Sequence, residues 1–323
     1  MKINDLKEIK MEYLNKINVP NNRFGIEIEF AGSDYKETEM ELKMRFPYRE
    51  NLEYNMCQKK APVEKYETWK IKREKTVENR IEAGRITGGE INSPILTNNE
   101  KTWKELETIC EFLKTREGII INDFCSIHVH VEEKILPTLK EIINLIKLWI
   151  AYEDVIYKFS YGEADIPRRI IYCFARPFGQ ERNIKEIIQK LDTIETLKDL
   201  MILIRYERKY GLNITNLLNE NKKTIEKRTS NGTINKIIIQ NDARFTLNFM
   251  NYAKEENFDE EYINYKLKKY EPINIESEAN DEKAHDIANR IYKEEIDKLY
   301  FYKQYYKAYE DDIEKTLHLW YHH

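Results

Sequence analysis

Two kinds of hydrophobic pattern divide the chain into predicted strands and predicted helices. Short runs in which apolar and polar residues alternate, or in which β-branched and aromatic residues gather, are typical of strands. The predicted strands are Phe24–Phe30, Thr68–Val77, Gly89–Ile91, Ser126–Val131 and Thr224–Arg228, with weaker β character at Leu212–Leu217, Ile234–Ile239 and Phe245–Phe249.

Longer segments with apolar residues at helical spacing predict helices. One runs from about Lys101 to Lys114, after the capping-type stretch Thr97-Asn98-Asn99. A second covers about Pro137 to Phe159, and a third lies between about Ile184 and Tyr210 and is expected to be broken once.

The order of these elements indicates the fold class. Strands interleave with helices without a regular βαβ repeat, which favours an α+β fold with an antiparallel sheet. From about Asp259 the chain is rich in Lys, Glu and Tyr and has almost no β signal. We therefore expect a main domain at residues 1–258 and a helical extension at residues 259–323 that packs on it. The polar, irregular segment Lys36–Tyr66 is interpreted as a flap over a site.

Composition narrows the class of protein. The chain has 323 residues with 57 acidic and 53 basic side chains and a net charge of −4, which gives no reason to expect nucleic-acid or membrane binding. Its start is polar and no apolar run is long enough to span a bilayer, so a cytoplasmic protein is expected. The four cysteines form no CxxC pair, which argues against a zinc site or a disulfide framework. No P-loop or Rossmann glycine motif is present.

The run Phe24–Phe30 carries the first candidate chemistry. Side chains alternate between the two faces of a strand, so Ile26 and Ile28 point to one face and Glu27 and Glu29 to the other. Two carboxylates at this spacing lie roughly 7 Å apart. That arrangement suits two neighbouring divalent cations, or one cation and its phosphate ligand. The alternative is an amphipathic strand with a solvated acidic face.

Two further strands carry candidate residues by the same alternation. His128 and His130 share one face of Ser126–Val131, where they could ligate a metal or contact phosphate. They could equally be hydrogen-bonded, partly buried histidines. Glu226 and Arg228 share a face of their strand, which suits a metal ligand beside a phosphate-binding guanidinium, or an ordinary ion pair.

Glu90 and Glu74 are the remaining acidic candidates. Glu90 follows Gly88-Gly89, where the backbone can approach a ligand closely. Glu74 lies in a charge run, which favours a solvated side chain.

Taken together, the motifs resemble those of a known family. FGIEIEF, the tryptophan-led WKIKREKTV, GGEINSPIL, CSIHVHV, and LNITNL with TIEKR occur in this order over roughly Arg23 to Met250. The ordered set is similar to the amidoligase family of the glutamine synthetase and glutamate–cysteine ligase superfamily. The resemblance implies a glutamine synthetase catalytic-domain-like fold, in which the concave face of an antiparallel sheet carries metals and ATP and helices lie behind it.

The resemblance also implies roles for individual residues. His130 would face the phosphates or the substrate, and Arg228 would hold the transferring phosphate. Arg169 and Tyr172, in the stretch RRIIYC, would lie at the substrate end. The implied metal ligands are Glu27, Glu29, Glu90, His128 and Glu226.

Two positions depart from the family pattern. Relatives carry an aspartate followed two positions on by a hydroxyl residue, where this chain has Glu74-Lys75-Thr76, so Thr76 would be the hydroxyl residue at the cofactor site. Relatives carry an aromatic residue between the glutamate and the arginine of the last strand. Here Lys227 stands in that place, so we expect that face of the strand to be more exposed.

The implied activity is ATP-dependent carboxylate–amine ligation through an acyl phosphate, with Mg2+ or alternatively Mn2+. Its substrates would be small-molecule or peptide carboxylates and amines. A phosphotransferase of the same fold and a non-catalytic binding or regulatory protein are the alternatives. The sequence leaves the oligomeric state open.

Overall fold

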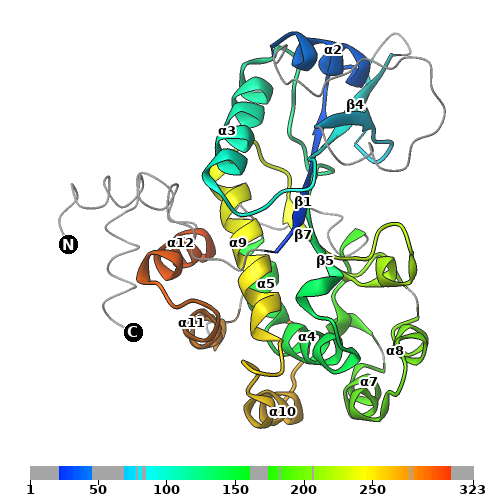
Figure 1. The fold of residues 1–323 in the computed structure, drawn as a ribbon, viewed down its shortest axis with the longest axis vertical. Helices are drawn as coiled ribbons and strands as arrows, with labels where there is room; N and C mark the ends of the chain where they lie inside the picture. The colour runs from blue at the N-terminus through cyan, green and yellow to red at the C-terminus, as the bar shows by residue number, and fades with distance from the viewer. Residues whose placement is uncertain are drawn as a thin grey trace.

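The computed structural model describes residues 22–45, 69–77, 79–81, 85–160, 174–181, 183–205, 207–275, 277 and 279–306. Within them the fold is α+β, and every strand pair in the sheet is antiparallel (Figure 1). The strand order is β2-β4-β1-β5-β7-β6, and β3 pairs with β4 outside this path. The strands are β1 (Phe24–Ala31), β2 (Lys70–Arg73), β3 (Asn79–Ile81), β4 (Arg85–Asn92), β5 (Ser126–Glu132), β6 (Leu212–Asn213) and β7 (Thr224–Asn231).

A layer of helices covers one face of the sheet. Helix α9 packs against β5, α5 packs against β7, and α3 packs on α9, so these helices lie along one side of the strands in Figure 1. The α-helices are α2 (Tyr35–Arg45), α3 (Glu100–Thr115), α4 (Leu139–Ala151), α5 (Glu153–Phe159), α7 (Ile184–Lys190), α8 (Leu197–Leu203), α9 (Lys236–Tyr252), α10 (Glu260–Lys268), α11 (Ala279–Ile291) and α12 (Glu295–Tyr305).

The alternation predicted for β1 is confirmed on its apolar side. Ile26 and Ile28 are fully buried and belong to the main hydrophobic core, together with Val129 from β5 and Phe245 from α9. Burial of such side chains is the main favourable contribution to folding. Since Ile26 and Ile28 point into the core between the sheet and the helices, Glu27 and Glu29 point to the opposite face of the sheet.

Two segments predicted to have β character are helical instead. Four of the six residues of Ile234–Ile239 and all of Phe245–Phe249 lie in α9, which begins after the N-cap Asn235. The helix packs between the sheet and α11 and α12, so it is buried almost all round. Because polar residues such as Asp242 and Arg244 are buried together with the apolar ones, the buried positions of α9 do not form a simple apolar stripe at helical spacing. The β-branched and aromatic residues therefore indicated strands where tertiary packing selects a helix.

Two other predictions need smaller corrections. The helix expected over Pro137–Phe159 consists of α4 and α5, which are separated at Tyr152. The start of the flap expected at Lys36–Tyr66 is helical, because α2 extends to Arg45. The rest of that segment lies outside the described residues.

The expected exposure around Lys227 is also wrong. Its side chain is fully buried on the helix-facing side of β7, where it is paired with Asp242 of α9. The charged partner on α9 allows a lysine to occupy an interior position, which an unpaired lysine would avoid.

Most of the described residues after Asp259 lie in the helices α10, α11 and α12. Helix α10 packs on α4, and α11 and α12 pack on α5 and α9, on the side away from the sheet (Figure 1). The domain boundary at residue 258 stays a prediction. Within the described residues, no helix is both long enough and apolar enough to cross a lipid bilayer.

A capping box at the start of α4 gives a first testable prediction. The Thr138 hydroxyl accepts a hydrogen bond from the Glu141 backbone N–H at 3.2 Å, while the Glu141 carboxylate accepts one from the Thr138 backbone N–H at 3.1 Å. We expect Thr138→Ala to lower the free energy of unfolding by about 1 kcal/mol. Urea denaturation measures the change. Thr108→Ala in the middle of α3 is the control and should cost much less, because alanine favours helix interiors.

Candidate active site

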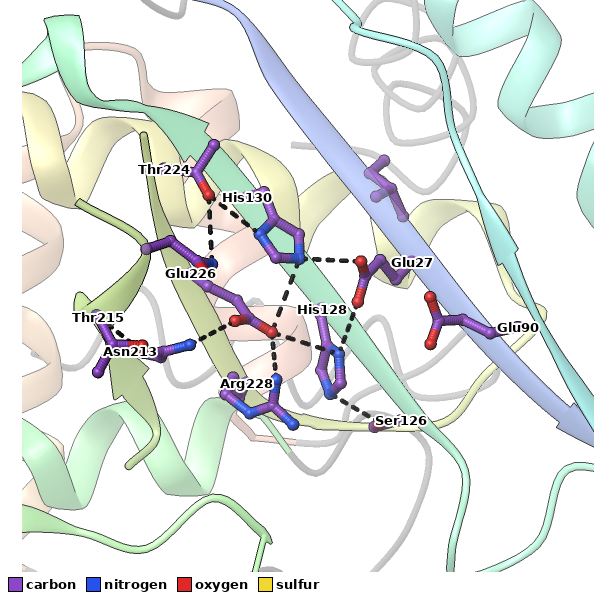
Figure 2. A network of polar contacts seen from close by, with 12 residues as sticks. Glu27, Glu90, Ser126, His128, His130, Asn213, Thr215, Thr224, Glu226 and Arg228 are labelled. Carbon is purple, nitrogen blue, oxygen red and sulfur yellow. Dashed lines mark hydrogen bonds and ion pairs between the residues drawn. The ribbon is translucent and has the colours of Figure 1, made fainter. Parts of the chain in front are cut away.

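Four adjacent strands bring acidic and histidine side chains together on the face of the sheet that lies away from α9. Figure 2 shows these side chains in front of the strands, with the helix behind. Strand register accounts for the arrangement, because residues that face each other across antiparallel strands have neighbouring side chains. The facing pairs are Glu27 and His128, Glu29 and Glu90, and His130 and Glu226.

The centre of the site is a cluster of two carboxylates and two imidazoles. Nδ1 of His128 lies 3.1 Å from Glu27 Oε2 and 3.5 Å from Glu226 Oε1. Nε2 of His130 lies 3.2 Å from Glu27 Oε1 and 3.6 Å from Glu226 Oε1. Potential ligand atoms of Glu27, His130 and Glu226 all lie within 4.8 Å of one another, and we call these three residues the Glu27 group.

Charge pairing favours the ionised forms of Glu27, Glu226 and His130 despite their burial. Burial acts to raise the pKa of Glu27, but His130 and His128 outweigh it and hold the pKa well below its usual range. Burial likewise acts to raise the pKa of Glu226, and His130 and Arg228 bring it below the usual value. The pKa of His130 is raised, because Glu226 and Glu27 outweigh the effect of burial. A proton on His130 thus balances two carboxylates that would otherwise need another cation.

A second acidic group lies next to the first, on β1, β4 and the residue after β2. Ligand atoms of Glu29, Glu74 and Glu90 lie within 4.8 Å of one another, and we call these the Glu90 group. Lys72 Nζ lies 2.8 Å from Glu90 Oε1. Burial and the negative charge of Glu27 raise the pKa of Glu90 to about 7 against the opposing effect of Lys72. Glu74 is therefore part of an acidic cluster and not simply a solvated member of a charge run.

The glycine before Glu90 is explained by packing within the chain. A Cβ on Gly89 would lie 2.7 Å from the Phe30 ring and 2.9 Å from Tyr35 Cβ. The glycine thus lets Phe30 and the start of α2 pack closely on β4. This packing explains why a glycine stands at position 89. The close approach of a ligand, which the sequence suggested, is not needed to explain it.

Ser126 connects the two groups. Its hydroxyl donates a hydrogen bond of 2.5 Å to Glu29 Oε2, and it contacts His128 Nε2 at 2.9 Å. Both contacts are buried. Ser126 therefore fixes the orientation of His128 relative to the Glu90 group, a role that the sequence did not indicate.

Two residues donate hydrogen bonds to Glu226, and a third orients one of them. Arg228 Nη1 donates to Glu226 Oε1, and Asn213 Nδ2 donates to Oε2 at 2.7 Å. The Thr215 hydroxyl in turn donates to Asn213 Oδ1 at 2.7 Å, which orients the amide. Asn213 and Thr215 belong to the LNITNL motif, so the motif order carried a signal for them, although no role followed from it.

A cavity of about 600 Å³ opens beside the Glu27 group. Glu27 and His130 are among the residues that line it. Its other walls include apolar side chains and basic side chains, among them Ile71, Pro94, Ile95, Lys70, Lys72 and Lys222. Gly25 also lines the cavity, and a Cβ there would lie 3.6 Å from Ser93 Oγ and 4.0 Å from His130 Cβ. A volume of this size is typical of small-molecule sites.

The predicted site residues therefore fall into three sets. The six residues in the facing pairs come together, and Arg228 contacts Glu226. Thr76 instead donates a hydrogen bond of 2.8 Å to Glu74 Oε1 at the edge of the Glu90 group. Arg169 and Tyr172 lie outside the described residues.

The donor atoms fit divalent cations. The Glu90 group offers only carboxylate oxygens, which are the ligands that Mg2+ prefers. The Glu27 group adds an imidazole nitrogen, which extends the choice to transition-metal ions. Nε2 of His130 is buried and makes no well-formed hydrogen bond within the described part of the chain, although two carboxylates lie beside it. Both groups are thus suited to hold a cation between their side chains.

Comparison with known proteins identifies the class. The model of a family described as "putative amidoligase enzyme" matches residues 20–250, and the chain belongs to this family. Membership indicates a ligase-type enzyme. Searches of curated proteins and of solved structures give no significant match. The matched segment contains every described residue of the candidate site.

Proposed function

We propose that the protein is an ATP-dependent carboxylate–amine ligase that forms an amide bond through an acyl phosphate. The observation that carries the proposal is the pair of adjacent acidic groups on one sheet face, with Arg228 against Glu226, in a chain of the amidoligase family. We also propose that the sheet and its helices form a glutamine synthetase-like catalytic domain, and that the reaction takes place in the cytoplasm.

The two acidic groups would hold the metal ions. Glu29, Glu74 and Glu90 suit one Mg2+, and Glu27, His130 and Glu226 suit a second Mg2+ or Mn2+. His128 contacts both carboxylates of the Glu27 group, so it could replace His130 as the nitrogen ligand. Bound metal ions neutralise the charge that develops on phosphate oxygens during transfer.

The cavity would receive the nucleotide. Its apolar walls can cover a base and its basic side chains can pair with phosphates, while Glu27 and His130 mark the end nearest the metal groups. The terminal phosphate would then lie close to the acidic groups, and Arg228 would bind its equatorial oxygens.

The proposed reaction has two steps. An oxygen of the substrate carboxylate attacks the γ-phosphorus of ATP, the bond to the β–γ bridging oxygen breaks, and ADP leaves. The amine nitrogen then attacks the acyl carbon, the carbon–oxygen bond to phosphate breaks, and the amine loses a proton. The residues of the site contribute mainly by positioning the reactants and balancing charge, as is usual for phosphoryl transfer.

Product analysis tests the reaction class. We expect purified protein with Mg2+, ATP and a panel of carboxylates and amines to release ADP and phosphate in equal amounts, without AMP or pyrophosphate. Hydroxylamine should intercept the acyl phosphate as a hydroxamate, because it is a strong small nucleophile. Glu226→Gln, which loses a charged ligand, is the matched control for contaminating ATPases.

Other outcomes identify the alternatives. Release of AMP would contradict an acyl phosphate and indicate an acyl adenylate. A stable phosphorylated product that no amine consumes would identify a phosphotransferase. A protein that binds no nucleotide by calorimetry in the presence of Mg2+ would match a non-catalytic role.

A further inference from the structure

A fully buried lysine lies directly beneath the candidate active site. Lys227 stands between Glu226 and Arg228 in β7, but its side chain extends to the opposite face of the sheet, toward α9. Its Nζ donates hydrogen bonds of 2.6 Å to Asp242 Oδ1 and 2.5 Å to Ser230 Oγ. Ser230 Oγ donates in turn to Asp242 Oδ2 at 2.8 Å. The three side chains form a closed, buried triangle, which we call the Lys227 clasp.

The clasp spans an irregularity in the pairing of β5 with β7. Ile127 pairs with Ser230 and Val129 pairs with Lys227, so β5 advances by 129 − 127 = 2 residues while β7 advances by 230 − 227 = 3. The extra residue in β7 makes this a β-bulge, which bends a strand and redirects a side chain. Arg228 lies within it.

The bulge explains why one carboxylate can hold both ends of the segment. In a regular strand, residues three positions apart point to opposite faces. Here the extra residue brings Lys227 and Ser230 to the same face, where each meets a different oxygen of Asp242. On the other face, Arg228 contacts Glu226, and Lys227 lies between these two residues in the chain. A regular pairing would turn Ser230 away from Asp242. It would leave Arg228 on the same face as Glu226, but it would remove the local bend and added twist of β7 that set the angle at which Arg228 extends.

We propose that Asp242 is a positioning residue, which maintains the β7 bulge through Lys227 and Ser230 and thereby directs Arg228 at the metal and phosphate end of the site. The proposal rests on the proposed function only for the role of Arg228. The bulge and its dependence on the clasp are properties of the fold and can be tested without substrate.

The test variant removes the whole ion pair. Lys227→Met with Asp242→Leu leaves no unpaired buried charge, and apolar replacement of a buried ion pair is often tolerated by a fold. The matched control is Arg244→Met with Asp297→Leu. That pair is also buried and also involves α9, but it connects α9 to α12. If the double variant does not fold, Ser230→Ala removes one contact of the clasp with less disturbance.

Crystal structures provide the first measurement. We expect the clasp variant to lose or move the register shift between Ile127 and Val129 and to separate Arg228 from Glu226. The Arg244/Asp297 control should keep both features. An unchanged bulge and an unchanged Arg228–Glu226 contact in a folded clasp variant would overturn the proposal.

The second measurement is the affinity for Mn2+, which electron paramagnetic resonance can determine. Arg228→Gln removes a cation that contacts Glu226, so we expect Mn2+ to bind roughly tenfold more tightly. The clasp variant should shift the affinity in the same direction, and combining it with Arg228→Gln should add nothing, because both act through one guanidinium. A simple loosening of the site would weaken Mn2+ binding instead, and additive effects would also contradict the proposal. If wild-type protein binds no Mn2+, the metal part of the proposed function fails, and the crystal structures alone decide on the clasp.

Discussion

Replacement of Glu226 by glutamine is expected to abolish measurable ATP turnover while the fold is retained. Glutamine has nearly the same shape, so the hydrogen bond from Asn213 can persist, but the charge that faces His128, His130 and Arg228 is lost. Loss of a residue that merely orients a metal ligand typically costs 10- to 100-fold, so loss of a direct ligand should cost more than about 100-fold. The same result is expected for Glu27→Gln.

The measurement is steady-state ADP release, with circular dichroism and thermal unfolding to establish that each variant is folded. Glu133→Gln is the matched control. Glu133 follows β5 directly and forms a partly exposed ion pair with Lys223, outside both acidic groups. Turnover of folded Glu27→Gln and Glu226→Gln at the wild-type rate would remove both residues from the proposed metal site.

The strands that build the site were predictable because their two faces differ so clearly. Glu27 and Glu29 alternate with buried isoleucines, and His128 and His130 alternate with buried valines, so the shared face of each pair follows from a period of two. The alternation of side chains within one strand does not predict which residues of neighbouring strands lie opposite each other. The approach of Glu226 to His130 depends on the β5–β7 register, and a shift of one residue would place it on the other face.

The supporting residues were missed for related reasons. Ser126 and Asn213 are common polar residues whose importance comes from a single buried contact with a distant partner. The exposure expected at Lys227 follows from a lysine in the place of an aromatic residue, and no local signal in the sequence indicates its buried partner. Asp242 is fifteen positions away on a helix that was itself mistaken in part for strands. Because α9 was not recognised as one helix, the burial of Lys227 against Asp242 could not be predicted.

Arg228 is the residue for which we expect the largest catalytic effect among the basic side chains of the site. Its side chain is 23% exposed, so it is open to a ligand, while the adjoining Glu226 is almost completely buried. Nη1 contacts Glu226, and Nε approaches the Phe174 carbonyl oxygen at 3.5 Å. Within the described residues, no hydrogen bond uses Nη2. The guanidinium therefore has donors to offer to a phosphate while it remains anchored.

Arg228→Met should lower kcat by about 1,000-fold or more, because arginines that stabilise a transferring phosphoryl group contribute roughly 10³ to 10⁵. Arg228→Lys should recover only part of this loss, since lysine keeps the charge but not the planar fork of donors. Binding of ATP should weaken much less than kcat falls, because the guanidinium acts mainly as charge develops. Separate measurement of kcat and of the dissociation constant for ATP distinguishes the two effects.

A distant arginine provides the comparison for this last prediction. Arg290 on α11 donates to Asp286 at 2.8 Å and to the Tyr252 hydroxyl at 3.0 Å, far along the chain from the acidic groups. Arg290→Lys should reduce stability without changing kcat. If Arg228→Met retained kcat within about threefold, transition-state stabilisation by this residue would be excluded. A matching loss in kcat and in ATP affinity would instead indicate that Arg228 serves mainly to bind the ground state.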